Sequence, residues 1–285
     1  MIRPQKIVAL AALLLCGAAP RAPIRLGPEA AKAPQRIITL APSLTETVLA
    51  LGAGERLIGV TRFDDAPEVG ALPRVGGYVD PSVEAVLSLR PDLLLVEPSP
   101  GNRAAVERMA ALGTPILAVH LGTQEEILAG LREIGKALGL APRGAELAAE
   151  TAARLEAVAR RSKSLAKVRT LVVYDWEPLV VAGPGSFADR LLEQAGALNA
   201  AAGARSAYPV YSAELAMRAA PEVIIDAADV PDPPRERILK LPGLDKARLA
   251  LASPNLFRPG PRLAEALEEL FGLVHPEARD ERAQR

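Results

Sequence analysis

The positions of the aromatic residues are the feature of this sequence that indicates a function, and that function is ligand binding. The chain has only nine aromatic residues in 285, too few to furnish a core. Seven of them fall in predicted loops, mostly just after predicted strands: Phe63, Tyr78, Tyr174, Trp176, Tyr208, Tyr211 and Phe257. Open α/β sheets bind ligands beyond the carboxyl ends of their strands. The pattern therefore predicts a site for a large, flat, partly apolar ligand, although rings that cap core edges are the alternative.

The residues that could support catalysis form no recognisable constellation. Asp64 and Asp65 are paired carboxylates that could bind a cation, but a solvated turn is the simpler interpretation. His120 ends a predicted strand, where a lone histidine is more often structural. The Gly-Pro-Gly-Ser segment at residues 183–186 precedes a predicted helix, yet it lacks a P-loop lysine and favours a plain turn. We therefore predict no catalytic residues, no metal site and no cofactor.

Composition excludes several other classes of function. The 34 basic residues match the 34 acidic ones, so no net charge attracts nucleic acid or an anionic membrane. The single cysteine excludes an internal disulfide framework, and the two histidines exclude a three-histidine metal site. With 49% hydrophobic and 24% charged residues, the chain has the composition of a globular protein.

Residues 1–22 have the features of a secretory signal. Basic residues precede an apolar stretch at residues 7–15, and small residues follow it. The stretch is too short to span a bilayer. Two outcomes stay open for Cys16 at its end: a lipid anchor, although Leu15 stands where lipoprotein signals usually carry a small residue, or removal by cleavage nearby. Both predict an exported protein, in the periplasm.

Strands and helices alternate along the remaining chain. Short apolar runs predict strands at residues 36–41, 57–60, 93–96, 116–119, 170–174, 180–181, 223–225 and 247–251. Ser43 with Glu46, and Thr123 with Glu126, fit capping boxes that start helices. Further helices are predicted to begin near Pro81, Phe187, Ser212 and Pro261. Such alternation predicts mainly parallel sheets covered by helices.

One long helix divides this pattern into two halves. Residues 142–166 are rich in Ala, Leu, Glu and Arg and have an apolar face, which predicts a helix of about 25 residues. The sequence thus predicts an N-terminal α/β lobe at residues 35–141, this bridging helix, a C-terminal α/β lobe at residues 168–275 and a charged tail at residues 276–285. The fold class is α/β, with two Rossmann-like lobes and a ligand cleft between them.

Several segments of the chain resemble one family. They are RIITLAPSLTE at residues 36–46, VGGYVDPSVE at 75–84, LRPDLLL at 89–95, GPGSFAD at 183–189, SAEL at 212–215 and APEVII at 220–225. Together they resemble the helical-backbone periplasmic substrate-binding proteins of ABC importers for vitamin B12, iron siderophores and haem. The family has two α/β lobes bridged by one long helix, binds its ligand between them and performs no reaction.

The resemblance implies roles for particular residues. By motif position, Phe63, Tyr78, Tyr174, Tyr208 and Arg258 are similar to the cleft contacts of vitamin B12 binders. These five residues would hold the ligand through aromatic faces and one guanidinium group.

Four more residues are assigned from the same resemblance. Glu97 stands where vitamin B12 binders often carry an aromatic residue, and Trp176 is expected to compensate for it. Glu84 and Glu214 resemble the two surface carboxylates, one per lobe, that the family presents to arginines of the permease. The alternative for both glutamates is a solvated first-turn residue favoured by the helix dipole.

The resemblance implies an exported monomer that captures a corrinoid and delivers it to a permease and ATPase of an ABC import complex. No nucleic-acid partner and no cofactor are expected. An iron siderophore or haem is the alternative ligand. An exported enzyme of the same fold, or a solute sensor that signals through a membrane receptor, is the alternative from another class.

Overall fold

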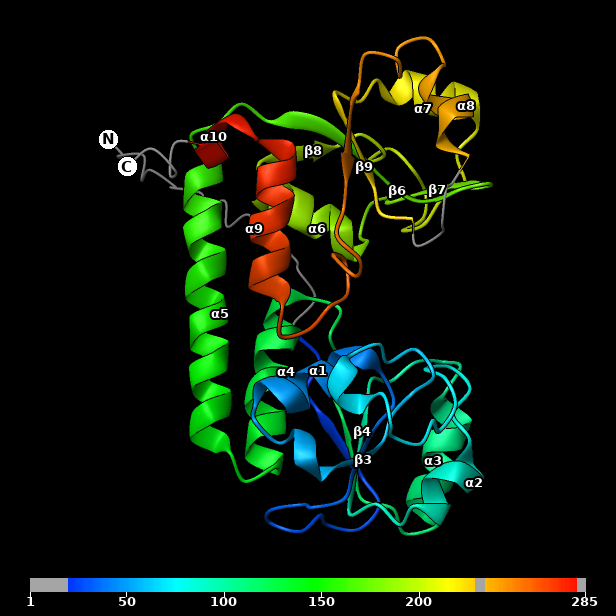
Figure 1. Ribbon diagram of the computed structural model, residues 1–285, viewed down its shortest axis with the longest axis vertical. Helices are drawn as coiled ribbons and strands as arrows, with labels where there is room; N and C mark the ends of the chain where they lie inside the picture. Colours follow the sequence, from blue (N-terminus) through cyan, green and yellow to red (C-terminus); the bar gives the residue numbers. More distant parts are fainter. Residues whose placement is uncertain (1–19, 229–233, 281–285) are drawn as a thin grey trace, which may run out of the picture.

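Two β-sheets, one in each half of the chain, organise this computed structural model, which describes residues 20–228 and 234–280 (Figure 1). Most of the predicted signal segment, with Cys16, lies outside the described residues, as does the end of the tail at residues 281–285. Within the part that is described, no helix is long and apolar enough to cross a membrane.

The N-terminal lobe is built on a five-stranded sheet with the order β1-β5-β4-β2-β3. Its strands are β1 Ile24–Leu26, β2 Ile37–Thr39, β3 Leu57–Gly59, β4 Leu93–Val96 and β5 Ile116–Ala118. All neighbours pair in parallel except β1, which runs antiparallel to β5 at the sheet edge. The helices are α1 Pro42–Ala50, α2 Val83–Ser88, α3 Arg103–Ala111 and α4 Gln124–Ala137. Strands β2, β4 and β5 are buried throughout, as continuous apolar runs in a covered parallel sheet require.

The C-terminal lobe has a second five-stranded sheet with the order β10-β9-β6-β7, and β8 pairs with β6. Its strands are β6 Val168–Trp176, β7 Leu179–Val181, β8 Ala197–Asn199, β9 Val223–Asp226 and β10 Arg248–Leu251. Among the strands of this lobe that the structure describes, only β7 is antiparallel to its neighbour. The helices are α6 Phe187–Gln194, α7 Ala213–Ala219, α8 Arg235–Leu239, α9 Leu263–Val274 and α10 Glu277–Asp280. The two parallel-rich sheets confirm the predicted α/β class.

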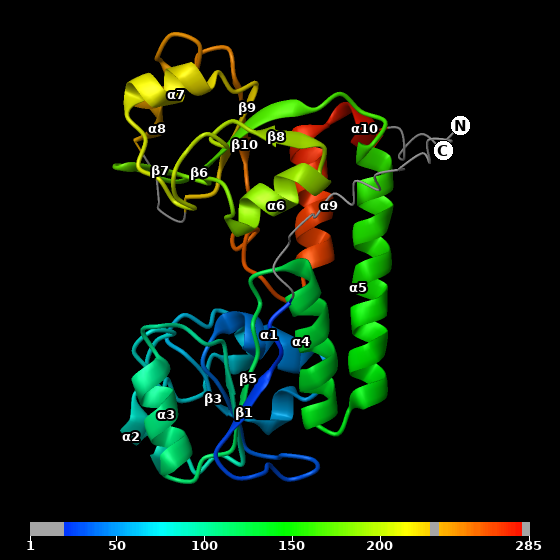
Figure 2. The same ribbon diagram turned by 180° about the vertical axis from the view of Figure 1, so that it is seen from behind.

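A single helix, α5 Ala141–Ser162, runs along both lobes (Figure 2). It packs against α4 of the N-terminal lobe and against α9 of the C-terminal lobe. Thr151, Leu155 and Val158 lie on its buried face. Gly135 allows α4 to approach α5 closely, because a Cβ atom there would lie 2.7 Å from the Cα of Gly144. The helix ends four residues before the predicted end at residue 166.

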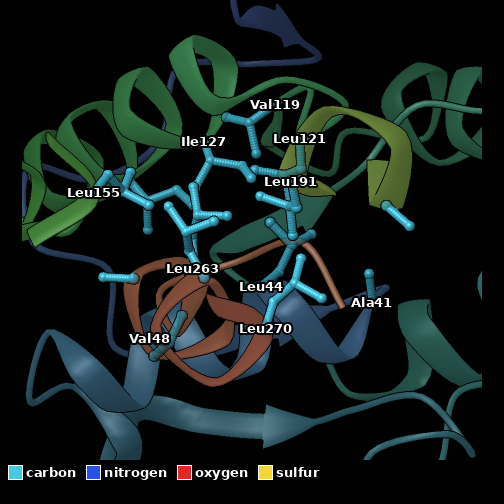
Figure 3. Close-up of a cluster of buried hydrophobic side chains, with 14 of the residues drawn as sticks. Ala41, Leu44, Val48, Val119, Leu121, Ile127, Leu155, Leu191, Leu263 and Leu270 are labelled. Atoms are coloured by element: carbon cyan, nitrogen blue, oxygen red, sulfur yellow. The ribbon is translucent and has the colours of Figure 1, made fainter. Parts of the chain in front are cut away.

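One hydrophobic core continues from lobe to lobe beside this helix (Figure 3). Leu44 and Ile127 come from the N-terminal lobe, and Leu191 and Leu270 come from α6 and α9 of the C-terminal lobe. All four are buried. Burial of apolar surface between the lobes opposes hinge motion, since opening would return that surface to water.

Helix starts differ from the predicted capping boxes in an informative way. Thr123 caps α4 as predicted, and its Oγ1 accepts a hydrogen bond from the backbone N of Glu126 at 3.1 Å. The box at Ser43 and Glu46 was a wrong prediction: α1 begins at Pro42, and its N-cap, Ala41, makes no side-chain bond. Glu46 instead reaches the other lobe. Helix α2 begins at Val83, two residues later than predicted, because Ser82 is its N-cap.

Candidate ligand-binding site

Three aromatic side chains gather at one place in the C-terminal lobe. The ring centroids of Tyr174 and Tyr208 lie 5.6 Å apart, and those of Tyr174 and Phe257 lie 5.8 Å apart. Both pairs are edge-to-face, an arrangement that the ring quadrupole favours. A cavity of about 320 Å³ is lined by Tyr174 together with residues 227–228 and 252–258. We call Tyr174, Tyr208 and Phe257 the aromatic wall.

The aromatic wall is partly open to solvent. The side chain of Tyr208 is 55% exposed, whereas Tyr174 is half-buried between its two neighbours. Burial raises the pKa of the Tyr174 phenol above its usual value, so this group stays protonated in ordinary buffers. The structure thus brings together two residues predicted as ligand contacts and adds Phe257, which the sequence had placed only in a loop.

The N-terminal lobe contributes a polar group of residues at the carboxyl end of β4. Asn102 organises it: Nδ2 donates to the backbone O of Tyr78 at 3.0 Å and to the backbone O of Glu97 at 2.9 Å. Its Oδ1 accepts from the backbone N of Ser99 at 3.0 Å. Asn102 is 1% exposed, so this amide is buried and satisfied. Asn102 is thus a positioning residue, and its sequence context gives no sign of this role because an asparagine before a helix is ordinary.

Glu97 and Glu126 carry carboxyls with opposite perturbations. Burial raises the pKa of Glu97 to about 7, against a smaller lowering influence from Arg21. Hydrogen bonds from Arg21 lower the pKa of Glu126 to about 2. Arg21 Nε lies 2.8 Å from Glu126 Oε1, and Arg21 Nη2 lies 3.2 Å from Oε2. We call Tyr78, Glu97, Arg21 and Glu126 the polar wall.

Two contacts tie the polar wall to its surroundings. The backbone N of Gly122 donates to Glu126 Oε2 at 3.0 Å, and Arg190 of α6 donates to the backbone O of Gly122. Because α6 belongs to the C-terminal lobe, the loop beside Glu126 lies where the lobes meet. His120 is close to Arg21 and Glu126, and burial lowers its pKa. Among the described residues, no group of three or more His, Cys, Asp or Glu side chains could hold a metal ion.

The predicted contact Phe63 lies on an N-terminal loop with two different aspartates. Its ring is 52% exposed, and the Arg62 guanidinium lies 4.8 Å from the ring centroid. Asp64 is buried, and its Oδ2 accepts from the backbone N of Thr61 at 2.8 Å. The side chain of Asp65 points away from the loop and bonds to Arg258 of the C-terminal lobe. The pair is therefore a turn with one outward carboxylate.

Arg258, predicted to hold the ligand, is bonded to two carboxylates of the other lobe. Its Nη1 lies 2.7 Å from Glu46 Oε1 and 2.9 Å from Asp65 Oδ1. Its Nη2 lies 3.3 Å from Asp65 Oδ2 and 2.6 Å from Asn255 Oδ1. Arg262 also bonds to Glu46, at 3.1 Å. The guanidinium thus lies beside the aromatic wall with both of its terminal nitrogens engaged.

The expectation that Trp176 would compensate for Glu97 is corrected by the structure. Trp176 is 3% exposed and packs in the core of the C-terminal lobe. Its Nε1 donates to Oδ1 of the buried Asp226 at 2.8 Å. The β6–β7 register shifts between Val173 and Asp175, which places Tyr174 in a β-bulge. A bulge breaks the alternation of side chains along a strand, so Trp176 does not follow Tyr174 onto the wall.

The remaining candidates lie apart from the walls. Glu84 and Glu214 are exposed first-turn residues of α2 and α7, and Glu214 lies 3.5 Å from Arg218. Both helices lie on the side of their lobe away from α5 (Figure 1). The 183–186 segment is a plain turn: Ser186 caps α6, and the backbone N of Gly185 donates to Asp189 Oδ2 at 2.8 Å.

Known proteins share this architecture. A vitamin B12-binding protein of Pectobacterium carotovorum subsp. carotovorum (strain PC1) is 27% identical over 83% of this chain and 87% of its own. An uncharacterised ABC transporter substrate-binding lipoprotein, YvrC of Bacillus subtilis (strain 168), is 28% identical over 86% of this chain and 82% of its own. The periplasmic haem-binding protein RhuT from Roseiflexus sp. RS-1 superposes with a TM-score of 0.75 at 26% identity, covering 86% of this chain and 99% of that one. The family described as periplasmic binding protein matches residues 37–243, and the chain belongs to that family.

Proposed function

We propose that this protein captures a corrinoid between the aromatic wall and the polar wall and releases it unchanged to a membrane permease. The observation that carries the proposal is the edge-to-face group of Tyr174, Tyr208 and Phe257 beside Arg258. A corrin ring offers an apolar face to such rings, and its edge carries amide groups. Amide N–H groups are donors that suit the carboxyl oxygens of Glu97 and Glu126.

Haem or a ferric siderophore is the second candidate, supported by likeness to a haem-binding relative. Two features of the polar wall weigh against haem. Its propionates would approach the Glu126 carboxylate and the Glu97 carboxyl, which a pKa of about 7 leaves partly ionised at neutral pH, and like charges repel. A tyrosine ligand to iron is a phenolate, yet burial and then Glu97 raise the pKa of Tyr78.

The partners follow from the family. Substrate-binding relatives of ABC transporters imply a permease and an ATPase, and we infer that Glu84 and Glu214 dock on the permease, one from each lobe. Delivery to a permease requires export, and we infer a periplasmic location with Cys16 as a candidate lipid anchor. Capture without a reaction accords with the relatives, which are a vitamin B12-binding protein and a substrate-binding lipoprotein. An exported enzyme would convert its ligand, and a sensor would act without a permease.

Titration of the purified protein distinguishes these candidates. Calorimetry and absorption spectra are recorded with cyanocobalamin, haem and a panel of ferric siderophores. We expect binding of cyanocobalamin at micromolar concentration or tighter, about −8 kcal/mol or better, with the corrinoid recovered intact. Tighter binding of haem or of a siderophore would replace the corrinoid assignment. Conversion of the ligand would replace the binding protein with an enzyme.

A further inference from the structure

The two carboxylates that hold Arg258 differ in burial and in support. The Glu46 side chain is 15% exposed and is shared by Arg258 and Arg262. The Asp65 side chain is 56% exposed and is held by Arg258 and by Asn255 Nδ2, at 2.9 Å. Hydrogen bonds from Arg258 lower the pKa of Asp65. Glu46 is thus the inner partner of the guanidinium and Asp65 the outer one.

Asp65 is not needed to join the lobes or to shape its own loop. The continuous core through Leu44, Leu191 and Leu270 already joins the lobes (Figure 3). The loop is held by Asp64, whose Oδ2 accepts from both the backbone N and the Oγ1 of Thr61. An exposed ion pair of this kind contributes about 0–1 kcal/mol to stability. Neither stability nor loop shape therefore explains why the Asp65 carboxylate bonds to Arg258 of the other lobe.

The position of Arg258 supplies that reason. Arg258 and Tyr174 line the same cavity, and Phe257 of the aromatic wall precedes Arg258 in the chain. A guanidinium fork binds carboxylate and phosphate in a bidentate manner. An anionic group on a ligand at the aromatic wall would therefore meet donors that Asp65 already holds.

We propose that Asp65 is a specificity-determining residue, a tethered competitor that holds Arg258 until a phosphodiester or carboxylate of the ligand displaces it. This inference rests on the proposed function of the site. Glu46 keeps the guanidinium in place during the exchange. Because Asp65 is tethered, its effective concentration is high, and small free anions compete poorly. A ligand that also covers the aromatic wall gains additional contacts, which allow its anionic group to displace Asp65 from Arg258.

The test uses ligand pairs that differ in the anionic group. Cyanocobalamin has a phosphodiester that cobinamide lacks, and haem has carboxylates that its dimethyl ester lacks. Calorimetry compares the native protein with Asp65→Asn. We expect Asp65→Asn to bind the anionic ligand of the pair up to about fivefold more tightly than the native protein does, because an exposed ion pair contributes about 1 kcal/mol at most. Its affinity for the ligand without the anionic group should be unchanged. Equal or weaker binding of the anionic member would overturn the proposal.

Two control variants separate the effect from general changes. Glu107→Gln removes a comparably exposed carboxylate, 58% exposed and 2.8 Å from Arg103 on α3, and should change no affinity. In an Arg258→Gln background, Asp65→Asn should have no effect on either ligand pair. Asp65→Ser serves as a second variant, and thermal melting verifies that each protein is folded.

Inorganic phosphate provides a probe that does not depend on the corrinoid assignment. If the native protein binds no macrocycle, the proposed function fails. Tighter phosphate binding by Asp65→Asn than by the native protein, lost when Arg258→Gln is added, would still support the competitor. Equal phosphate affinity in all three proteins would reject it.

Discussion

The two lobes share an α/β architecture but differ in the chemistry of the side chains that we propose as ligand contacts. The C-terminal lobe contributes the aromatic rings of Tyr174, Tyr208 and Phe257, in edge-to-face contact. The N-terminal lobe contributes Glu97 and the Arg21–Glu126 ion pair. Equivalent sheets thus support an apolar wall and a polar wall. A ligand with an apolar face and a polar edge satisfies both, whereas a ligand of uniform polarity leaves one of them unsatisfied.

Each lobe also carries one exposed first-turn glutamate, Glu84 on α2 and Glu214 on α7, and the largest expected effect tests their proposed docking role. Reversing both charges, Glu84→Lys with Glu214→Lys, should reduce uptake to background, because permease arginines would then face lysines. Ligand affinity should be unchanged, since neither glutamate lies at the aromatic wall. The matched control reverses Glu146 and Glu156, which are exposed on α5 and are expected to tolerate it. Normal uptake by the docking variant would remove the docking role.

The aromatic wall is tested by two neighbouring rings of β6. Tyr174→Ala removes the ring that contacts both Tyr208 and Phe257, and we expect corrinoid affinity to fall about ten- to a hundredfold. Trp176→Phe removes the bond to Asp226 and should reduce the free energy of unfolding by about 1–3 kcal/mol while leaving affinity unchanged. Calorimetry and urea denaturation measure the two quantities. If Trp176→Phe lost as much affinity, the division between wall and core would be wrong.

The polar wall is tested by the pH dependence of stability. The pKa of Glu97 is raised from its usual 4.5 to about 7, so the folded state binds more protons than the unfolded state between these values. The free energy of unfolding should therefore fall as the pH rises from about 4.5 to about 7, by at most about 3 kcal/mol. Glu97→Gln should remove this fall in urea denaturation series recorded across that range.

Glu126, on the same wall, should change stability with pH in the opposite direction. Its pKa is lowered to about 2, so its contribution to stability is present above about pH 4.5 and is lost as the pH falls toward 2. Glu126→Gln should flatten the acid side of the stability curve and leave the neutral side unchanged. Parallel curves for the two variants would contradict the assigned pKa directions.

The sequence predicts the elements within each lobe better than the contacts between the lobes. Local signals predicted eight of the ten strands that the described residues form, together with most of α5, because apolar periodicity is a property of short segments; β1 and β8 were missed. The ligand contacts assigned to Tyr174 and Tyr208 stay predictions. The partners of Arg258 could not be predicted, since Glu46 lies 212 residues away and Asp65 lies 193 residues away. Trp176 was misassigned because a bulge changed which face of β6 it occupies. Both failures depend on tertiary contacts that no local pattern contains.

The smallest expected effect concerns Arg21, the member of the polar wall that lies within the predicted signal of residues 1–22. A signal of residues 1–22 would remove Arg21, yet Arg21 holds Glu126 through its side chain and through its backbone N, at 3.1 Å. We therefore expect cleavage upstream, at the small residues before Pro20, and a mature chain that retains Arg21. Mass spectrometry of the exported protein identifies its first residue.

Substitution of Arg21 measures how much the retained arginine contributes to the stability of the protein. Arg21→Gln should raise the pKa of Glu126 toward its usual value and lower the free energy of unfolding by about 1 kcal/mol or less, since the arginine is largely exposed. A mature protein that begins after Arg21 and still binds its ligand with native affinity would show that the polar wall needs only Glu97, Tyr78 and Glu126. The difference between the two lobes would then depend on these three residues alone, without any residue of the predicted signal.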